Sequence, residues 1–327
     1  MFQLLNRFLG SFVLTMACAA VAGSAAAQPQ RATFRADWTF KAVHAPVFLA
    51  LERGYYAREG IDLQFLAGSG SANAVKSVGS KSDHFGMADA SVMARAVSDG
   101  APVRALAAIQ QVNPIAIAAN AEISSPKDLE GKTLVTTAAT GPAQLFSVFA
   151  KGAGFDPSKV AIANVAGNAQ LSTFMAGRGD AVTVYTNNEL LLLQARMPDK
   201  KLNVFRYGDY GVTMLNQVIL THTDLIATNP DFVRRFLRAT LEGFAQAQKD
   251  PSAAIDAFMK ANPAAERALL ERQLNASLML MHSTSSKGKP VGWMAEADWN
   301  TTLNLLERDL SMQGRKPTEA YFTNDLQ

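Results

Sequence analysis

Residues 37–62 read DWTFKAVHAPVFLALERGYYAREGID and begin at the end of a strand-like run. Pro46 suits the first turn of a helix, and Gly54 predicts where that helix ends. The polar and aromatic residues before Pro46 are therefore expected in the loop that connects a strand to the following helix. In an open α/β sheet, ligands bind at this edge. Trp38 offers a flat stacking face and His44 a hydrogen-bonding ring, so we expect both in a ligand site.

Composition and charge narrow the class of protein. The chain has 327 residues, of which 48% are hydrophobic and 18% charged, which is typical of a folded protein. This length allows one large domain or two of ordinary size. The net charge of +3 is small, and no run of basic residues exceeds two. We therefore expect neither a nucleic acid nor an anionic membrane surface as a partner.

The N-terminus predicts export. Arg7 precedes an apolar run, and the small residues Ala25–Ala27 end the segment. This order is typical of a secretory signal peptide, so we expect residues 1–27 to be removed by cleavage after Ala27 and the body to reach the periplasm. A membrane-spanning anchor fits less well because the apolar run is short and rich in small residues. A lipoprotein acylated at Cys18 is the alternative, and it is also exported.

Cysteine and histidine usage gives no sign of catalysis. Cys18 is the only cysteine and lies in the expected signal peptide, so the mature chain should have no disulfide, thiol nucleophile or cysteine metal site. No Walker loop, Gly-x-Ser-x-Gly elbow or His-Glu-x-x-His pair occurs. The scattered histidines are His44, His84, His222 and His282. We therefore expect no catalytic residue, no metal, no cofactor and no enzymatic activity.

Strand-like and helical patterns alternate along the chain, which predicts a mostly parallel sheet with helices on both faces. The pattern restarts near residue 120, and a strand at 217–221 should return the chain to the first sheet. We therefore predict an α/β protein of two lobes. Lobe 1 is expected to comprise residues 32–119 and 216–327, the latter mostly helical and with Trp299 in the core, and lobe 2 residues 120–215.

The opening stretch resembles the substrate-binding proteins of ABC importers that take up thiamine pyrimidine precursors, taurine, aliphatic sulfonates and nitrate. The shared pieces are an Asp-Trp pair, a nearby His, and an Ala-x-x-x-Gly-Tyr-Tyr-x-x-x-Gly-Ile-Asp run. Here these pieces are Asp37-Trp38, His44, and Ala50 to Asp62. With further similar segments, the resemblance covers nearly all of residues 32–327.

This resemblance implies a type II periplasmic binding protein, a monomer whose two lobes hold a small molecule in the cleft between them. Closure of the lobes would then be the signal for a membrane permease and its ATPase. The candidate ligand-binding residues lie at strand ends of both lobes. They are Asp37, Trp38, His44, Ser69, Ser71, Asp89, Thr140, Gly141, Tyr185, Asn188 and Glu189.

Several candidates also have an ordinary structural explanation. Ser69 and Ser71 either cap a helix starting near residue 74 and leave backbone N–H groups free for a ligand, or merely cap that helix. Asp89 either caps the following helix or contacts the ligand. Glu189 stabilises a helix N-terminus by its charge, whichever ligand is bound.

The candidates from lobe 2 depend more on the resemblance. The loop with Thr140 and the N–H of Gly141 matches the second-lobe ligand loop of these binders. In the pyrimidine-precursor group, a stretch like the one with Tyr185, Asn188 and Glu189 supplies hydrogen bonds to the heterocycle. A carboxylate can accept hydrogen bonds from a ring N–H and an exocyclic amine.

The ligand class is left open between two main alternatives. Stacking on Trp38, with His44 and Glu189 on the polar edges, favours a nitrogen heterocycle such as an aminopyrimidine. The Gly-Ser-Gly-Ser loop at residues 68–71 would equally suit a sulfonate, taurine or nitrate. A sensor that docks on a membrane receptor is a further alternative. The eukaryotic thiamine-pyrimidine synthases also look similar, but they are cytosolic and have a cysteine-rich motif.

Overall fold

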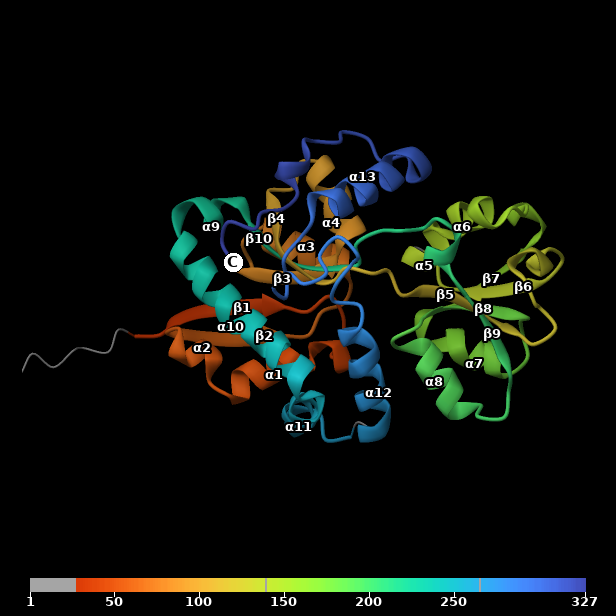
Figure 1. The fold of residues 1–327 in the computed structure, drawn as a ribbon, viewed down its shortest axis with the longest axis horizontal. Helices are drawn as coiled ribbons and strands as arrows, with labels where there is room; N and C mark the ends of the chain where they lie inside the picture. The colour runs from red at the N-terminus through yellow and green to blue at the C-terminus, as the bar shows by residue number, and fades with distance from the viewer. Residues whose placement is uncertain (1–27, 139, 265) are drawn as a thin grey trace, which may run out of the picture.

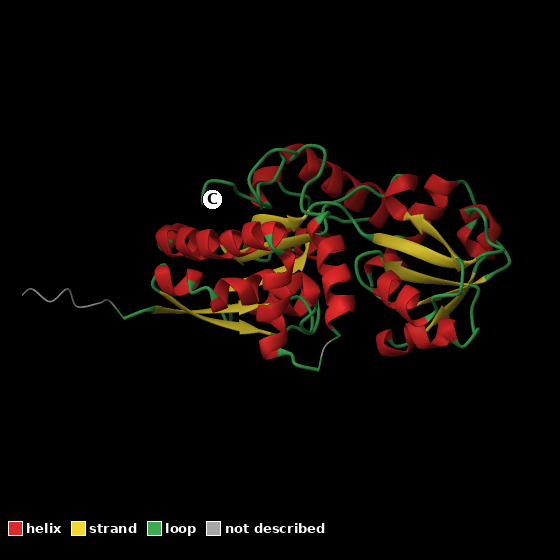
Figure 2. Ribbon diagram, turned by 60° about the horizontal axis from the view of Figure 1, so that its bottom comes forward, coloured by secondary structure: helices red, strands yellow, loops and turns green. Residues whose placement is uncertain are grey.

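The computed structural model describes residues 28–138, 140–264 and 266–327. Two five-stranded sheets form two lobes that lie side by side (Figure 1). Helices cover both faces of each sheet (Figure 2). This is the predicted two-lobed α/β architecture.

The sheet of lobe 1 has the order β2-β1-β3-β10-β4. Its strands are β1 (Gln30–Arg35), β2 (Ile61–Leu66), β3 (Phe85–Asp89), β4 (Val103–Gln110) and β10 (Gln217–His222). β1 pairs in parallel with β2 and β3, whereas β10 pairs antiparallel with β3 and β4. All strands of this sheet except β10 therefore end at the same edge.

The helices of lobe 1 come from both ends of the chain. The N-terminal set is η1 (Ala42–His44), α1 (Ala45–Glu52), α2 (Tyr55–Arg58), α3 (Ser71–Gly79) and α4 (Ala90–Ser98). The C-terminal set is α9 (Thr223–Thr228), α10 (Pro230–Lys249), α11 (Pro251–Ala261), α12 (Arg267–Leu278), α13 (Glu296–Leu310) and η6 (Thr318–Ala320). None of the helices in the described part of the chain is long and apolar enough to cross a bilayer.

Lobe 2 repeats the same arrangement with the order β7-β6-β8-β5-β9. Its strands are β5 (Ile115–Asn120), β6 (Thr133–Thr136), β7 (Ala161–Asn164), β8 (Ala181–Tyr185) and β9 (Leu202–Arg206). Here β5 is the strand that pairs antiparallel with both neighbours. The helices are η2 (Pro126–Leu129), α5 (Gly141–Gln144), α6 (Phe146–Ala153), η3 (Pro157–Lys159), η4 (Gly167–Ala169), α7 (Gln170–Met175), α8 (Glu189–Arg196) and η5 (Tyr207–Tyr210).

The first crossing between the lobes corrects one predicted boundary. Residues 115–119 were assigned to lobe 1, but β5 pairs with β8 and β9 of lobe 2. The chain therefore crosses between Gln110 and Ile115 and not after residue 119. Apolar alternation predicts that a strand forms but does not show which sheet it joins. The chain crosses back between Arg206 and Gln217.

The predicted signal peptide, with Cys18, lies outside the described residues.

Local sequence signals explain the long return helix. The side chain of Asn229 accepts a hydrogen bond from the N–H of Phe232 at 3.2 Å, and Pro230 follows at the first helical position of α10. The apolar face of α10 then packs on the lobe 1 sheet, where Phe236 stacks on Phe85 with ring centroids 3.5 Å apart. Trp299 is buried on the other face of this sheet, as predicted for a core residue.

Candidate functional site

Four side chains from both lobes gather where strands end at the lobe junction. Asp37 follows β1, Asp89 ends β3, Tyr185 ends β8, and Glu189 begins α8. Burial raises the pKa of Tyr185 well above its ordinary value, and the charges of Asp89, Glu189 and Asp37 raise it further. The three carboxylates therefore lie close enough to Tyr185 to act on one phenol.

His44 lies behind Asp37 and is fully buried. Its Nδ1 accepts the backbone N–H of Lys41 at 3.0 Å, so the ring proton belongs on Nε2, which lies 2.9 Å from Oδ1 of Asp37. Burial alone would raise the pKa of Asp37, but this hydrogen bond and the charge of Lys41 outweigh it, so the pKa is lowered. His44 thus fixes an ionised Asp37 and uses both ring nitrogens within the protein.

The Trp38 loop is held by backbone hydrogen bonds to the loop after β2. Gly68 donates its N–H to the carbonyl of Trp38 at 2.9 Å, and Gly70 donates to the carbonyl of Asp37 at 2.8 Å. A Cβ on Gly68 would lie 1.9 Å from the carbonyl oxygen of Ala36, so only glycine permits this approach. Trp38 keeps 49% of its surface exposed. The indole therefore stands on a fixed backbone and presents a free face.

Neither serine of this loop caps a helix. Helix α3 begins at Ser71, not near residue 74, and its N-terminus has no side-chain cap. Ser71 accepts the backbone N–H of Asp89 through Oγ at 3.0 Å. The exposed Ser69 accepts a hydrogen bond from the side chain of Asn73 at 3.0 Å. Ser71 therefore joins the loop to the end of β3, while Ser69 bonds within its own segment.

Asp89 caps α4, which is one of its two predicted roles. Its Oδ1 accepts the backbone N–H of Ser91 at 2.9 Å and the Ser91 hydroxyl at 2.6 Å. Burial raises the pKa of Asp89 to about 6, although the Ser91 bonds oppose this, and the nearby charge of Asp37 also raises it. Asp89 is thus a carboxyl group that titrates near neutral pH.

Glu189 connects three parts of the junction. Its Oε2 accepts the backbone N–H of Tyr185 at 3.1 Å, and its Oε1 accepts the side-chain amide of Asn188 at 2.7 Å. Lys41 Nζ of lobe 1 lies 3.5 Å from the same Oε1. The Asn188 oxygen in turn accepts the Gln273 amide of α12 at 2.8 Å. Asn188, predicted to contact the ligand, therefore bridges the two lobes.

The loop at Thr140 faces the same phenol. Thr140 donates its hydroxyl to the carbonyl of Thr137 at 2.7 Å and does not cap α5. A Cβ added to Gly141 would lie 3.6 Å from the Tyr185 hydroxyl. The structure therefore brings Gly141 next to Tyr185, while the Thr140 hydroxyl is used within its own loop.

Several residues of the junction were not among the sequence candidates. Lys41 lies within residues 37–62, and its charge in this polar and aromatic loop could have identified it as a site residue. Gln273 and Ser277 lie one turn apart on α12, and both are buried against lobe 2. Sequence alone shows an i, i+4 polar pair on this helix but not that the pair is buried.

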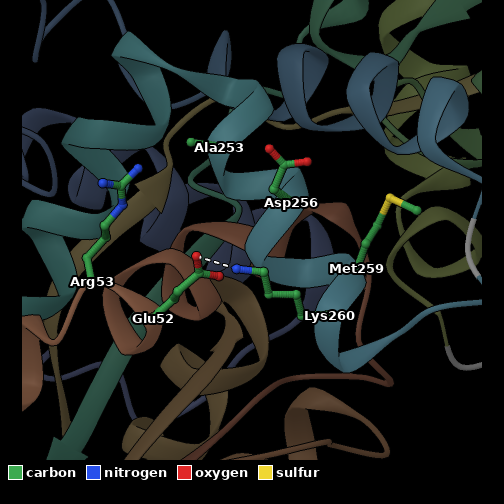
Figure 3. Close-up of a pocket in the computed structure, with 6 residues that line it drawn as sticks. All are labelled: Glu52, Arg53, Ala253, Asp256, Met259 and Lys260. Atoms are coloured by element: carbon green, nitrogen blue, oxygen red, sulfur yellow. Dashed lines mark hydrogen bonds and ion pairs between the residues drawn. The ribbon is translucent and has the colours of Figure 1, made fainter.

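The surface hollow drawn in Figure 3 lies elsewhere, between α1 and α11. It has a volume of about 480 Å³ and includes none of the candidate residues. Lys260 and Glu52 form an ion pair of 2.7 Å within it, and Asp256 is paired with Arg267. Three of its charged side chains, Glu52, Asp256 and Lys260, are thus neutralised by protein partners. Within the described residues, no group of three or more His, Cys, Asp or Glu side chains is placed to hold a metal ion.

Comparison with known protein families shows to which family the chain belongs. Residues 41–254 match the model of the family described as NMT1/THI5 like. The chain belongs to this family. The match contains the loops of both lobes that follow Lys41, including Asp89, Tyr185 and Glu189.

Three relatives of this NMT1/THI5-like chain differ in what their names describe. It is 24% identical to the formylaminopyrimidine-binding protein of Halalkalibacterium halodurans, with 83% of each chain covered. It is 27% identical to the riboflavin-binding protein RibY of Chloroflexus aurantiacus, over 91% of this chain and 87% of that one. It is also 24% identical to the 4-amino-5-hydroxymethyl-2-methylpyrimidine phosphate synthase of Schizosaccharomyces pombe, over 67% of this chain and 66% of the synthase.

The solved structures show the fold. The alkanesulfonate-binding protein SsuA of Xanthomonas axonopodis pv. citri, bound to MOPS, aligns with a TM-score of 0.64 at 14% identity. The alignment covers 91% of the NMT1/THI5-like chain and all of SsuA. The chain thus has the periplasmic binding protein fold.

Proposed function

We propose that this chain is the solute-binding component of an ABC importer and captures a nitrogen heterocycle of the aminopyrimidine type between its lobes. The observation that carries the proposal is the placement of Asp37, Asp89 and Glu189 at element ends of both lobes, with Lys41 of lobe 1 lying 3.5 Å from Glu189 of lobe 2. Among the described residues, Lys41 is the one permanently charged cation that forms an ion pair with any of these three carboxylates, and it pairs with Glu189. The site is therefore rich in hydrogen-bond acceptors and negative charge.

Ring N–H groups and exocyclic amines are donors, so they match such a site. A sulfonate or nitrate would bring a further negative charge and meet repulsion. In the loop suited to an anion, the N–H groups of Gly68 and Gly70 already donate to backbone carbonyls. These contacts favour the heterocycle over the anion.

Trp38 supplies the apolar part of the proposed site. An exposed indole on a rigid loop can stack on a flat ring with little loss of conformational entropy, because the loop is already ordered. The remaining ligand contacts are proposed to come from Ser69, Ser71, Thr140, Gly141 and Asn188, beside the three carboxylates and Tyr185. His44 is proposed to act through Asp37.

The transport role rests on the fold together with the relatives. Two of the relatives described above are named as binding proteins of heterocycles, and both cover more of the chain than the synthase does. We propose that the chain works as a monomer in the periplasm after cleavage behind Ala27, without catalysis or cofactor. The partner would be a membrane permease with its ATPase, to which the closed lobes deliver the ligand.

A thermal-shift screen of the chain from Gln28 onward tests this function. The panel contains 4-amino-2-methylpyrimidine, formylaminopyrimidine, riboflavin, taurine, an alkanesulfonate and nitrate. A ligand at 100 times its dissociation constant stabilises the folded protein by about 2.7 kcal/mol, which shifts the melting temperature by a few degrees. Stabilisation by a heterocycle supports the proposal, and stabilisation by the anions alone overturns it.

Glu189→Gln makes the screen specific to the site. The variant removes the charge and keeps the side-chain size, so it should weaken binding of the amino-heterocycle. Because it also relieves repulsion, it should not weaken binding of an anion. Unchanged binding of the heterocycle would remove Glu189 from the site.

A further inference from the structure

We propose that Asn187 and Asn188 of lobe 2, with Gln273 and Ser277 of α12, form a latch that sets ligand affinity by holding the lobes together. This inference rests on the proposed ligand site between the lobes. The latch residues would be positioning residues, since they act on the ligand through lobe closure and through Glu189.

Two hydrogen bonds make the latch. Asn187 donates its side-chain amide to Oγ of Ser277 at 3.0 Å, and Gln273 donates to the side-chain oxygen of Asn188 at 2.8 Å. Asn187, Ser277 and Gln273 are each less than 9% exposed. Each bond runs from one lobe to the other, so a movement that separates α12 from Asn187 and Asn188 breaks both. Buried polar groups that lose their partner are costly unless water replaces it.

Helix α12 also supports the proposed ligand loop. Leu270 and Leu274, on the same buried face of α12 as Gln273 and Ser277, belong to the apolar cluster that contains Ala42 and Ala45 at the start of η1 and α1. The helix therefore packs on the Lys41–His44 segment and bonds to lobe 2 at the same time. Figure 1 shows α12 between this part of lobe 1 and α8.

The hydrogen bonds continue from the latch into the site. Asn188 accepts from Gln273 and donates to Glu189. Glu189 pairs with Lys41, whose backbone N–H is bound by His44, the partner of Asp37. The path leaves lobe 1 at Gln273 and returns to it at Lys41. Closure of the latch therefore aligns Glu189 and Asp37 for the ligand.

The net value of one such hydrogen bond predicts a three- to tenfold effect on affinity. Ser277→Ala and Gln273→Ala should each raise the dissociation constant by about this factor. The change should come mainly from faster dissociation, because release of the ligand requires the lobes to open. Ser277→Thr keeps the hydroxyl and should restore the affinity.

The matched control is Asn275→Ala on the same helix. Asn275 is exposed and lies between the two latch positions. Its loss should leave both the affinity and the dissociation rate unchanged. Asn187→Ala removes the same bond as Ser277→Ala from the side of lobe 2 and should reproduce its effect.

The experiment has two readouts on the chain from Gln28 onward. The first is stopped-flow dissociation of 4-amino-2-methylpyrimidine. The second is energy transfer between dyes at Lys249→Cys in lobe 1 and Arg178→Cys in lobe 2, since the sequence after Cys18 has no cysteine that would compete for dye. The latch variants should populate a more open form, with or without the pyrimidine.

The outcomes separate the two proposals. If Ser277→Ala and Gln273→Ala match Asn275→Ala in energy transfer, the latch is wrong even where the wild type binds the pyrimidine. If the wild type does not bind the pyrimidine but the latch variants open, the proposed ligand is wrong and the latch stands. An opened lobe distribution with faster release of the pyrimidine supports both.

Discussion

The imidazole of His44 lies directly behind the carboxylate of Asp37, with Nε2 2.9 Å from Oδ1 and no exposed surface of its own. The sequence predicted that His44 would meet the ligand. The structure instead uses its second nitrogen to hold the backbone of Lys41, so one buried ring fixes a carboxylate and the start of η1 together. Asp37 is the group of this pair that keeps exposed surface.

His44→Ala should therefore lose both stability and ligand affinity. It leaves the Lys41 N–H and Asp37 without their partner, at an expected cost of about 1–3 kcal/mol for each buried group. Urea unfolding and calorimetric titration with an aminopyrimidine measure the two effects. Asp37→Asn is the comparison, because it keeps an acceptor for Nε2 but removes the charge. If His44→Ala binds like the wild type, Asp37 does not need this support.

Trp38→Ala should weaken binding of a flat heterocycle by about 1–3 kcal/mol, the range measured when aromatic side chains that stack on bases are removed. Fold stability should hardly change, since the indole is 49% exposed. Titration calorimetry gives the affinity, with Trp38→Phe as the variant that keeps a stacking face. Equal affinity in wild type and Trp38→Ala would exclude stacking at this position.

Asp89 should make stability depend on pH. Its pKa is raised from 3.8 to about 6, so between these values the folded chain holds a proton that the unfolded chain has lost. The contribution of Asp89 to stability therefore falls as pH rises from 4 to 6 and is constant above. Asp89→Asn keeps an acceptor for Ser91 without the charge, so its free energy of unfolding relative to wild type should rise across this window by up to about 3 kcal/mol.

Urea unfolding of both proteins at pH 4.5, 5.5 and 7.5 measures this difference. A constant gap between Asp89→Asn and wild type would show that Asp89 has an ordinary pKa. The contacts with Ser91 would then stabilise the ionised form by as much as burial disfavours it.

Gly243→Ala tests the packing of α10 on α1. A Cβ at Gly243 would lie 2.5 Å from the carbonyl oxygen of Pro46 and 2.8 Å from the Cβ of Ala50, so the two helices must move apart. Overpacking of this kind costs about 1–3 kcal/mol. Gly208→Ala is the control, because a Cβ there meets nothing within 4 Å. Thermal unfolding should separate the two variants, and equal melting temperatures would contradict the close approach.

The sequence predicted the fold better than the site. Strand and helix alternation gave both lobes, and Trp299 was correctly placed in the core. The prediction placed β5 in the wrong lobe, because its apolar residues would suit either sheet. At the site, strand ends located Asp37 and Asp89 and a helix start located Glu189, but the partner of Asn188 is set by a contact distant in sequence. Gln273 is 85 residues from Asn188, a separation that no local pattern reports.

We expect the junction carboxylates to select a donor-rich heterocycle and to reject anions. The most direct measurement is titration calorimetry of the chain from Gln28 onward with 4-amino-2-methylpyrimidine and with an alkanesulfonate under the same buffer. We predict that the pyrimidine binds at least about 100-fold more tightly, which corresponds to about 2.7 kcal/mol. A sulfonate that binds as tightly as the pyrimidine, or more tightly, would contradict this selectivity.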